Sequence, residues 1–241
     1  MNLNVSNDLE ELSTRVADWL IAYIHNTLKR QPRFTIALSG GNTPKKLYQL
    51  LSSDDYKNKI DWAKLHIFWG DERYVPFTDD RNNAKMAFDT LLNHVPVPRE
   101  QIHIMRTDME PGPSALAYEK ILMEYFTHKK HSFDLVLLGM GDNAHTLSLF
   151  PGYEIIHEKE KWVKAFYLQE QNTYRISLTV PIVNKSARVA FLVCGSDKAA
   201  SLYNVLYREY DPDLYPAQII QPYSGELYWF ADAKAAADVE P

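Results

Sequence analysis

Apolar residues along the chain alternate between helical spacing and short continuous runs. Residues 8–29 carry apolar side chains at helical spacing with acidic residues near the start, which predicts an amphipathic helix. Short apolar runs follow, most of them separated by segments of helical spacing, at 34–38, 65–69, 102–105, 133–138, 163–168, 176–180, 189–194 and 227–230. This alternation is typical of a mainly parallel sheet. We therefore predict an α/β, Rossmann-like fold with a mainly parallel central sheet flanked by helices.

Three further helices are predicted from local signals. The segment 44–51 opens with a proline after Asn42 and Thr43, and the segment 113–126 also opens with a proline and continues at helical spacing. The alanine-rich stretch 233–237 predicts a terminal helix. Because the sequence contains no internal repeat and no low-complexity linker, we expect one domain spanning residues 1–241.

Composition narrows the class of protein. The 241 residues are 46% hydrophobic and carry a net charge of −5, which favours a soluble enzyme-sized domain and argues against nucleic acid as a partner. No apolar stretch approaches the length of a membrane span. Cys194 is the single cysteine and lies in an apolar run, so we expect a buried, reduced thiol and a cytoplasmic location.

The segment 139–152 carries the strongest sign of chemistry. It follows the apolar run 133–138 directly and reads Gly-Met-Gly-Asp-Asn-Ala-His-Thr-Leu-Ser-Leu-Phe-Pro-Gly. Its first two glycines allow close approach of a ligand, and His145 stands where a short helix could begin, a position suited to proton transfer. A histidine that caps the following helix is the structural alternative.

In a parallel sheet the ligand usually lies beyond the carboxyl ends of the strands. Four segments supply polar groups there, namely 39–43, 70–73, 141–145 and 195–198, and Arg175 could join them. The first segment consists of Ser39, Gly40, Gly41, Asn42 and Thr43. Small residues before a helix start are typical of an anion cradle, with a plain turn as the alternative. The segment matches neither the Walker loop nor the dinucleotide glycine pattern.

Taken together, these motifs resemble the 6-phosphogluconolactonase family, a branch of the superfamily that also contains glucosamine-6-phosphate deaminases. The resemblance spans nearly the whole chain. It rests on the segments 38–44, 69–76, 139–141, 145–146, 148–152 and 225–229, together with Asn83, Arg175 and Lys198. It implies hydrolysis of a small phosphorylated sugar lactone, 6-phosphoglucono-δ-lactone, without a metal or an organic cofactor.

The resemblance also implies roles for individual residues. His145 would take a proton from the attacking water, since an imidazole titrates in the required range. Arg73, Arg175 and Lys198 would hold the phosphate, with surface ion pairs as the competing explanation. Asp71 and its neighbour Glu72 could serve as a base, or could orient Arg73 or the backbone of the loop. Asn83 is expected to fix the neighbouring loop.

The chain departs from the family pattern before the histidine, where Asn143-Ala144 replace the usual Asp-Gly. Asn143 can hydrogen-bond to the imidazole but supplies no charge, and Asp142 could compensate. Ala144 lacks the freedom of glycine at positive φ. Either the backbone at Ala144 has an ordinary conformation with negative φ, or the loop differs from that of its relatives.

Two other functions are compatible with parts of the pattern. Deaminases of the superfamily commonly have Asn-Glu-Pro-Gly where this chain reads Leu149-Phe150-Pro151-Gly152, so the carboxylate they use in ring opening is missing. A non-catalytic sugar-phosphate sensor would bind 6-phosphogluconate without accelerating hydrolysis of the lactone. Serine hydrolase chemistry is disfavoured because the chain has no Gly-x-Ser-x-Gly elbow. The sequence leaves the oligomeric state open.

Overall fold

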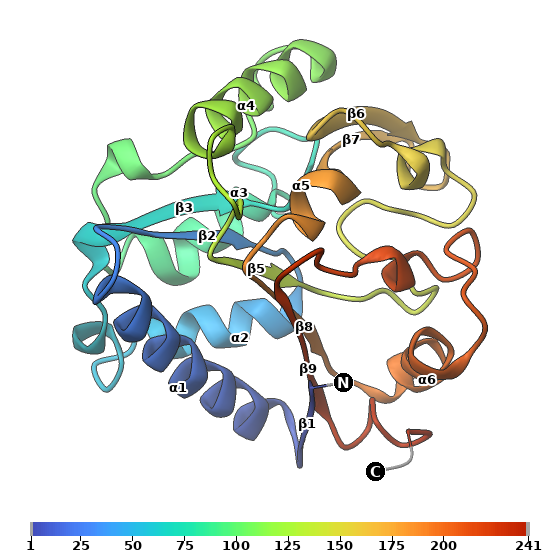
Figure 1. Ribbon diagram of the computed structural model, residues 1–241, viewed down its shortest axis with the longest axis horizontal. Helices are drawn as coiled ribbons and strands as arrows, with labels where there is room; N and C mark the ends of the chain where they lie inside the picture. Colours follow the sequence, from blue (N-terminus) through green and yellow to red (C-terminus); the bar gives the residue numbers. More distant parts are fainter. Residues whose placement is uncertain (1, 240–241) are drawn as a thin grey trace.

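A computed structural model describes residues 2–239, so the predicted domain limits at residues 1 and 241 lie outside the described residues. Within 2–239, six parallel strands form a central sheet in the order β1-β9-β8-β5-β2-β3 (Figure 1). This confirms the predicted α/β class. The strands of this sheet are β1 (Asn2–Ser6), β2 (Phe34–Leu38), β3 (Leu65–Trp69), β5 (Leu135–Leu138), β8 (Arg188–Val193) and β9 (Glu226–Asp232).

Helices cover both faces of the sheet. They are α1 (Leu9–Leu28), α2 (Asn42–Leu51), α3 (Asn83–Ala87), α4 (Pro111–Phe126), α5 (Val180–Asn184) and α6 (Ala199–Tyr207). Short helical turns lie between them, at Lys57–Lys59, Trp62–Lys64, Phe88–Leu92, Arg99–Gln101, Glu154–His157, Gln169–Gln171, Ser196–Lys198 and Pro216–Ile219. The predicted helices at 8–29, 44–51 and 113–126 are thus present, each within two residues of its expected bounds. None of the helices in residues 2–239 is long and apolar enough to cross a membrane.

The two faces of each central strand belong to different cores, as the period of two in a strand requires. In β2, Phe34, Ile36 and Leu38 join the apolar cluster under α1 and α2, whereas Ala37 joins the cluster under α4 and α5. The strands are buried on both faces, which is why they read as continuous apolar runs in the sequence. Figure 1 shows α1 and α2 together on one side of the sheet and α4 and α5 on the other.

A second, three-stranded antiparallel sheet contains β4 (Asp71–Arg73), β6 (Val163–Leu168) and β7 (Thr173–Leu178). The runs 163–168 and 176–180 were expected in the parallel sheet, and this expectation is wrong. The four residues between β6 and β7 are too few for the crossover that parallel strands need, so the two strands form a hairpin. Strand β7 ends at Leu178, and Val180 already belongs to α5.

Two other predicted elements are absent from the described residues. The run 102–105 forms no strand, since Ile102 makes only an isolated bridge to Ile67. The alanine-rich stretch 233–237 forms turns instead of a helix. Asp232 holds these turns, because its side chain accepts the amide of Ala235, and so short a stretch does not form a helix from alanine propensity alone. The strand Asn2–Ser6 was not predicted and pairs with β9.

The order of the strands positions a ligand crevice. From β2 the chain moves outward to β3 at one edge and then returns to β5 on the other side of β2. In open α/β sheets ligands bind at such a switch point, outside the carboxyl ends of the strands. The loops after β2 and β5, which contain the two most conspicuous sequence motifs, therefore lie beside each other.

Candidate active site

A pocket of about 430 Å³ lies at this switch point. It contains residues from five separate segments of the chain, including the loops after β2 and β5 and the antiparallel sheet. All but one of the predicted site residues line it, namely Ser39, Gly40, Gly41, Asn42, Thr43, Asp71, Arg73, His145, Arg175 and Lys198. Asn143 is the exception, and it lies beside the pocket in contact with His145.

The loop after β2 is held by tertiary contacts on one side and starts a helix on the other. The buried Tyr48 hydroxyl accepts the amide of Ser39 at 3.0 Å and donates to its carbonyl at 2.8 Å. Gly41 has φ +101° and precedes α2, and an added Cβ at Gly40 would lie 1.9 Å from Oδ1 of Asn83. Glycine is therefore required at both positions, because one needs the left-handed region and the other a close approach.

Arg73 and Arg175 stand directly opposite each other in the β4–β7 pair. Like charges at such positions repel and destabilise a sheet. Arg175 is only 4% exposed, and burial lowers the pKa of its guanidinium. Among the described residues, Nε of each arginine is buried without a hydrogen-bond partner. Two guanidinium groups with unused donors beside one pocket form a site for an anion.

Asp71 and Gln171 hold Arg175 in place. Oδ2 of Asp71 lies 3.6 Å from Nη1 of Arg175, and Nη2 donates to Oε1 of Gln171 at 2.5 Å. Asp71 also accepts from the Ser148 hydroxyl at 2.6 Å, and the side-chain amide of Asn83 donates to the backbone carbonyl of Asp71 at 3.0 Å. Asp71 therefore orients a cation of the pocket, and Asn83 joins the strand β4 to the loop at Gly40.

Glu72 is fully buried and has a structural role. Its carboxylate accepts three backbone amides, those of Arg73, Asn83 and Ala84. Burial raises the pKa of Glu72 to about 8, against the three hydrogen bonds, which lower it. Glu72 does not line the pocket, so of the two alternatives for this residue the structure supports orientation of the loop.

Asn143 fixes the tautomer of His145. Oδ1 of Asn143 accepts the backbone amide of His145 at 3.2 Å and lies 2.5 Å from its Nδ1. A backbone amide can only donate, so the atom between these two nitrogens is an oxygen, and Nδ1 carries a proton. The other ring nitrogen, Nε2, is then the free acceptor. Asn143 thus supplies a hydrogen bond to the imidazole without a charge.

His145 is neutral at ordinary pH. Burial is the main cause that lowers its pKa to about 4, with the carboxylate of Asp71 raising it and the cations Arg175 and Lys198 lowering it. The ring of Phe150 stacks on the imidazole at a centroid distance of 4.1 Å, which holds the ring plane and excludes water from one side. An uncharged imidazole with an acceptor at Nε2 can remove a proton from water.

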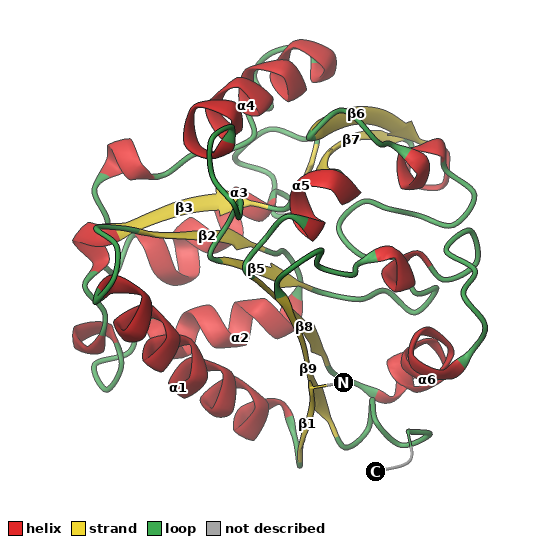
Figure 2. Cartoon of the chain, in the orientation of Figure 1, coloured by secondary structure: helices red, strands yellow, loops and turns green. Residues whose placement is uncertain are grey.

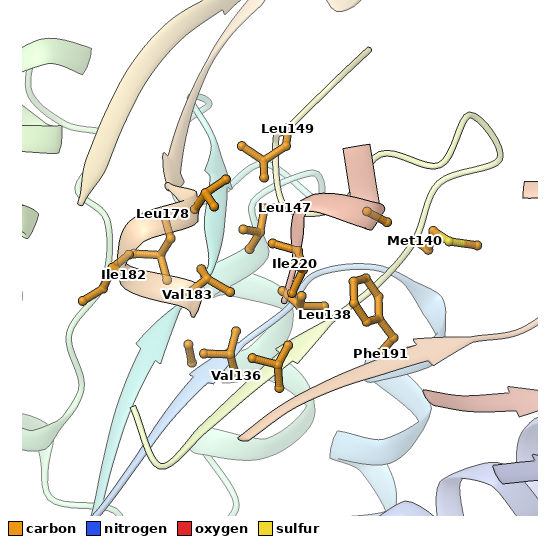
Figure 3. Close-up of a cluster of buried hydrophobic side chains, with 14 of the residues drawn as sticks. Val136, Leu138, Met140, Leu147, Leu149, Leu178, Ile182, Val183, Phe191 and Ile220 are labelled. Atoms are coloured by element: carbon orange, nitrogen blue, oxygen red, sulfur yellow. The ribbon is translucent and has the colours of Figure 1, made fainter. Parts of the chain in front are cut away.

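No helix begins at His145, so the expected helix start is wrong. The segment between β5 and β6 is drawn mostly as loop in Figure 2, with Leu147 at φ +54°. Apolar side chains anchor this loop instead. Met140, Leu147 and Leu149 are buried and join the cluster shown in Figure 3, between the two sheets and α5.

Two small residues determine how the imidazole fits. An added Cβ at Gly141 would lie 2.1 Å from Nδ1 of His145, so only glycine leaves room for the ring. Ala144 has φ +61° and is buried. The first alternative for Ala144, an ordinary backbone conformation, is therefore wrong. Ala144 adopts the left-handed conformation that glycine favours, at a cost of about 1–2 kcal/mol.

Lys198, Cys194 and Asp142 are the remaining residues that the sequence analysis considered. Lys198 lines the pocket and pairs with Asp197 at 2.9 Å. Cys194 was expected to be buried, and this is wrong, because it is only half-buried and lines the pocket. Its thiol donates to the carboxylate of Asp232, and burial raises its pKa to about 12. Asp142 is exposed. No group of three or more His, Cys, Asp or Glu side chains within residues 2–239 could hold a metal ion.

Sequence reasoning gave no role to Gln171 or Ser148. Ser148 lies in the segment 148–152, on which the family resemblance rests, so the sequence indicated that it lies near the site. Nothing in the sequence indicated its hydrogen bond to Asp71. Gln171 follows β6 in a short hairpin connection, and nothing in its surroundings distinguishes it from an exposed loop residue. Its position beside Arg175 results from the pairing of β6 with β7.

Comparison with known proteins shows the family of the chain. The family model described as "Glucosamine-6-phosphate isomerases/6-phosphogluconolactonase" matches residues 7–229. The chain belongs to this family. It is 39% identical over 241 residues to a 6-phosphogluconolactonase of Nostoc sp., covering 98% of each chain. It is 40% identical over 211 residues to one of Synechocystis sp., covering 86% of this chain and 85% of the relative.

A solved structure supports the fold. The 6-phosphogluconolactonase from Trypanosoma brucei superimposes with a TM-score of 0.87 at 24% identity, covering 99% of this chain and 98% of that one. The resemblance stated from the motifs is confirmed. The family includes both isomerases and lactonases, so the choice between them depends on the site.

Proposed function

We propose that this member of the family is a 6-phosphogluconolactonase, which hydrolyses 6-phosphoglucono-δ-lactone to 6-phosphogluconate in the oxidative pentose phosphate pathway. One observation carries the proposal. A neutral His145 with a free acceptor at Nε2 lies in the same pocket as Arg73, Arg175 and Lys198. The close relatives named above are lactonases of this kind.

The phosphate of the substrate is held by the cationic side of the pocket. Arg73 and Arg175 have unused donors, and a phosphate dianion would remove the repulsion between them. Lys198 adds an ammonium, and the segment 39–43 adds small residues around the start of α2. Together these groups fix the lactone with its carbonyl in reach of the imidazole.

Hydrolysis then requires one proton carrier. Nε2 of His145 accepts a proton from water as the water oxygen attacks the lactone carbonyl, and the imidazolium returns it to the ring oxygen when the C–O bond breaks. Asn143 keeps the proton on Nδ1 throughout, and the nearby charge of Asp71 favours the transient imidazolium. Asp71 therefore assists through charge and through Arg175, while His145 performs the proton transfer.

The contact between Phe150 and His145 disfavours the deaminase alternative. The ring of Phe150 occupies the position next to the imidazole, where deaminases of the superfamily commonly have a glutamate. A sensor would retain the phosphate donors but would not need a fixed tautomer at the histidine. Cytoplasmic location, independence of nucleic acid and the lack of a cofactor stay predictions.

The three functions are separated by three assays on the wild-type protein. The lactone is generated in situ and its consumption is followed with and without protein, subtracting spontaneous hydrolysis, and ammonia release from glucosamine 6-phosphate is measured in parallel. We expect faster loss of lactone and no ammonia. Ammonia release would establish the deaminase instead. Binding of 6-phosphogluconate by folded protein without faster hydrolysis would establish the sensor.

Removal of Arg73 tests the phosphate assignment. In Arg73→Ala we expect KM for the lactone to rise about tenfold or more with a smaller change in kcat, because the arginine binds ground state and transition state alike. Lys159→Gln, at an exposed lysine outside the pocket, is the control and should leave KM unchanged. An unchanged KM in Arg73→Ala would dispose of the assignment.

A further inference from the structure

A larger pocket, of about 950 Å³, lies at the opposite edge of the central sheet. It lies where β2, β5 and β8 begin, between the C-terminal ends of α1 and α4. The length of strand β2, on the order of 15 Å, lies between this pocket and the catalytic pocket. The two pockets share no lining residue, so the proposed lactonase function leaves this one without a role.

Positive charge is concentrated in this pocket although the whole chain carries a net charge of −5. The lining contains one carboxylate, Asp134, and five cationic side chains, which are Arg30, Arg33, Lys129, Lys130 and Arg188. Asp134 is already occupied, since it accepts the side chain of Gln31 and both the amide and the hydroxyl of Thr35.

Most of these cations have no carboxylate partner. Arg188 pairs with Glu226 at 2.8 Å. Arg30, Arg33, Lys129 and Lys130 take part in none of the ion pairs found within residues 2–239. The C-termini of α1 and α4 contribute only about half a negative charge each. The pocket therefore keeps a surplus of positive charge that a bound polyanion would neutralise.

Aromatic rings form the other part of the lining. Trp19, Tyr23 and Tyr125 are each only half-buried and line the pocket. The guanidinium of Arg33 lies 4.5 Å over the ring of Tyr125, and that of Arg188 lies 3.9 Å over Tyr23. A guanidinium stacked on a ring keeps its N–H edge available for phosphate oxygens.

We propose that this pocket binds a nucleoside polyphosphate. Arg30, Lys129 and Lys130 contact the phosphates, and the planar base packs against the aromatic lining at Trp19 and Tyr23. The volume is in the range of pockets that hold ligands of this size. His131 lies in the same lining, and its Nδ1 is a buried polar atom without a partner among the described residues.

Calorimetric titration of the full chain with ATP, in the absence of magnesium, tests the proposal. We expect saturable binding at one site per chain. Lys129→Gln/Lys130→Gln should weaken it about tenfold or more, because two charge-assisted phosphate contacts are lost. Lys159→Gln/Lys161→Gln is the matched control, since it removes the same charge from exposed lysines elsewhere and should leave the affinity unchanged.

Two further titrations locate the binding site and identify the part of the ligand that is recognised. Arg73→Ala, which alters only the catalytic pocket, should bind ATP as the wild type does, and tripolyphosphate should bind more weakly than ATP. No saturable binding, equal affinity in Lys129→Gln/Lys130→Gln, or loss of binding in Arg73→Ala would each overturn the proposal. Tripolyphosphate binding as tightly as ATP would overturn the assignment of the nucleoside. Both lysines are exposed, and thermal unfolding of the double variant verifies that it is folded.

Discussion

Two of the loops that line the catalytic pocket are built in different ways. The loop after β2 is short, has glycines at its two demanding positions, and leads directly into α2. The loop after β5 is long and irregular, has alanine and leucine in left-handed conformations, and is held by buried apolar side chains. The first follows from its own residues, whereas the second depends on the core beneath it. The proposed base thus comes from a loop fixed by tertiary packing. The loop after β2 adds small residues at the start of α2, while the proposed phosphate cations lie in β4, in β7 and after β8.

The same substitution in both loops gives the largest expected contrast. Gly141→Ala brings a Cβ to 2.1 Å from Nδ1 of His145 and must displace the imidazole, so we expect kcat to fall about a hundredfold. Gly40→Ala presses on Asn83 instead, and we expect mainly a rise in KM. Steady-state kinetics on both variants measure the split. Equal effects on kcat and KM in the two variants would remove the distinction between the loops.

A change of charge beside the base sharpens the comparison. Asn143→Asp places a carboxylate next to the imidazole, which stabilises its protonated form and raises its pKa from about 4 by about one unit or more. Because the neutral imidazole is the active form, the rate is lost as pH falls through this pKa. We therefore expect the acid limb of the kcat profile to move to higher pH in the variant. An acid limb at the same pH in both proteins would show that this limb does not report the titration of His145.

The smallest expected effect concerns Ala144. Glycine at this position would relieve about 1–2 kcal/mol of backbone strain. It would also lose about 0.8 kcal/mol from a buried methyl group and about 0.5–1 kcal/mol through the unfolded chain. These contributions nearly cancel, so Ala144→Gly should change Tm by less than about 3 °C. A larger shift in thermal unfolding would mean that the loop is strained or packed differently from this account.

The difference between local and tertiary causes also explains which features could be predicted from the sequence. The apolar runs that form β2, β3, β5, β8 and β9 and the helices that contain Pro44 and Pro113 have local causes. The structure has these elements within two residues of their expected bounds. The hairpin of β6 and β7, the partner of Asp71 and the position of Gln171 depend on contacts between distant segments. The helix expected at His145 failed for this reason, because apolar anchors at Met140 and Leu149 determine the path of that loop.

The central claim is that His145 carries the proton in the hydrolysis of the lactone. Its most direct test is the rate at saturating 6-phosphoglucono-δ-lactone for wild type and His145→Ala, with spontaneous hydrolysis subtracted. We predict that kcat falls by about a hundredfold to ten-thousandfold while KM changes little, as expected for loss of a general base. An unchanged kcat in a folded His145→Ala protein would contradict the account.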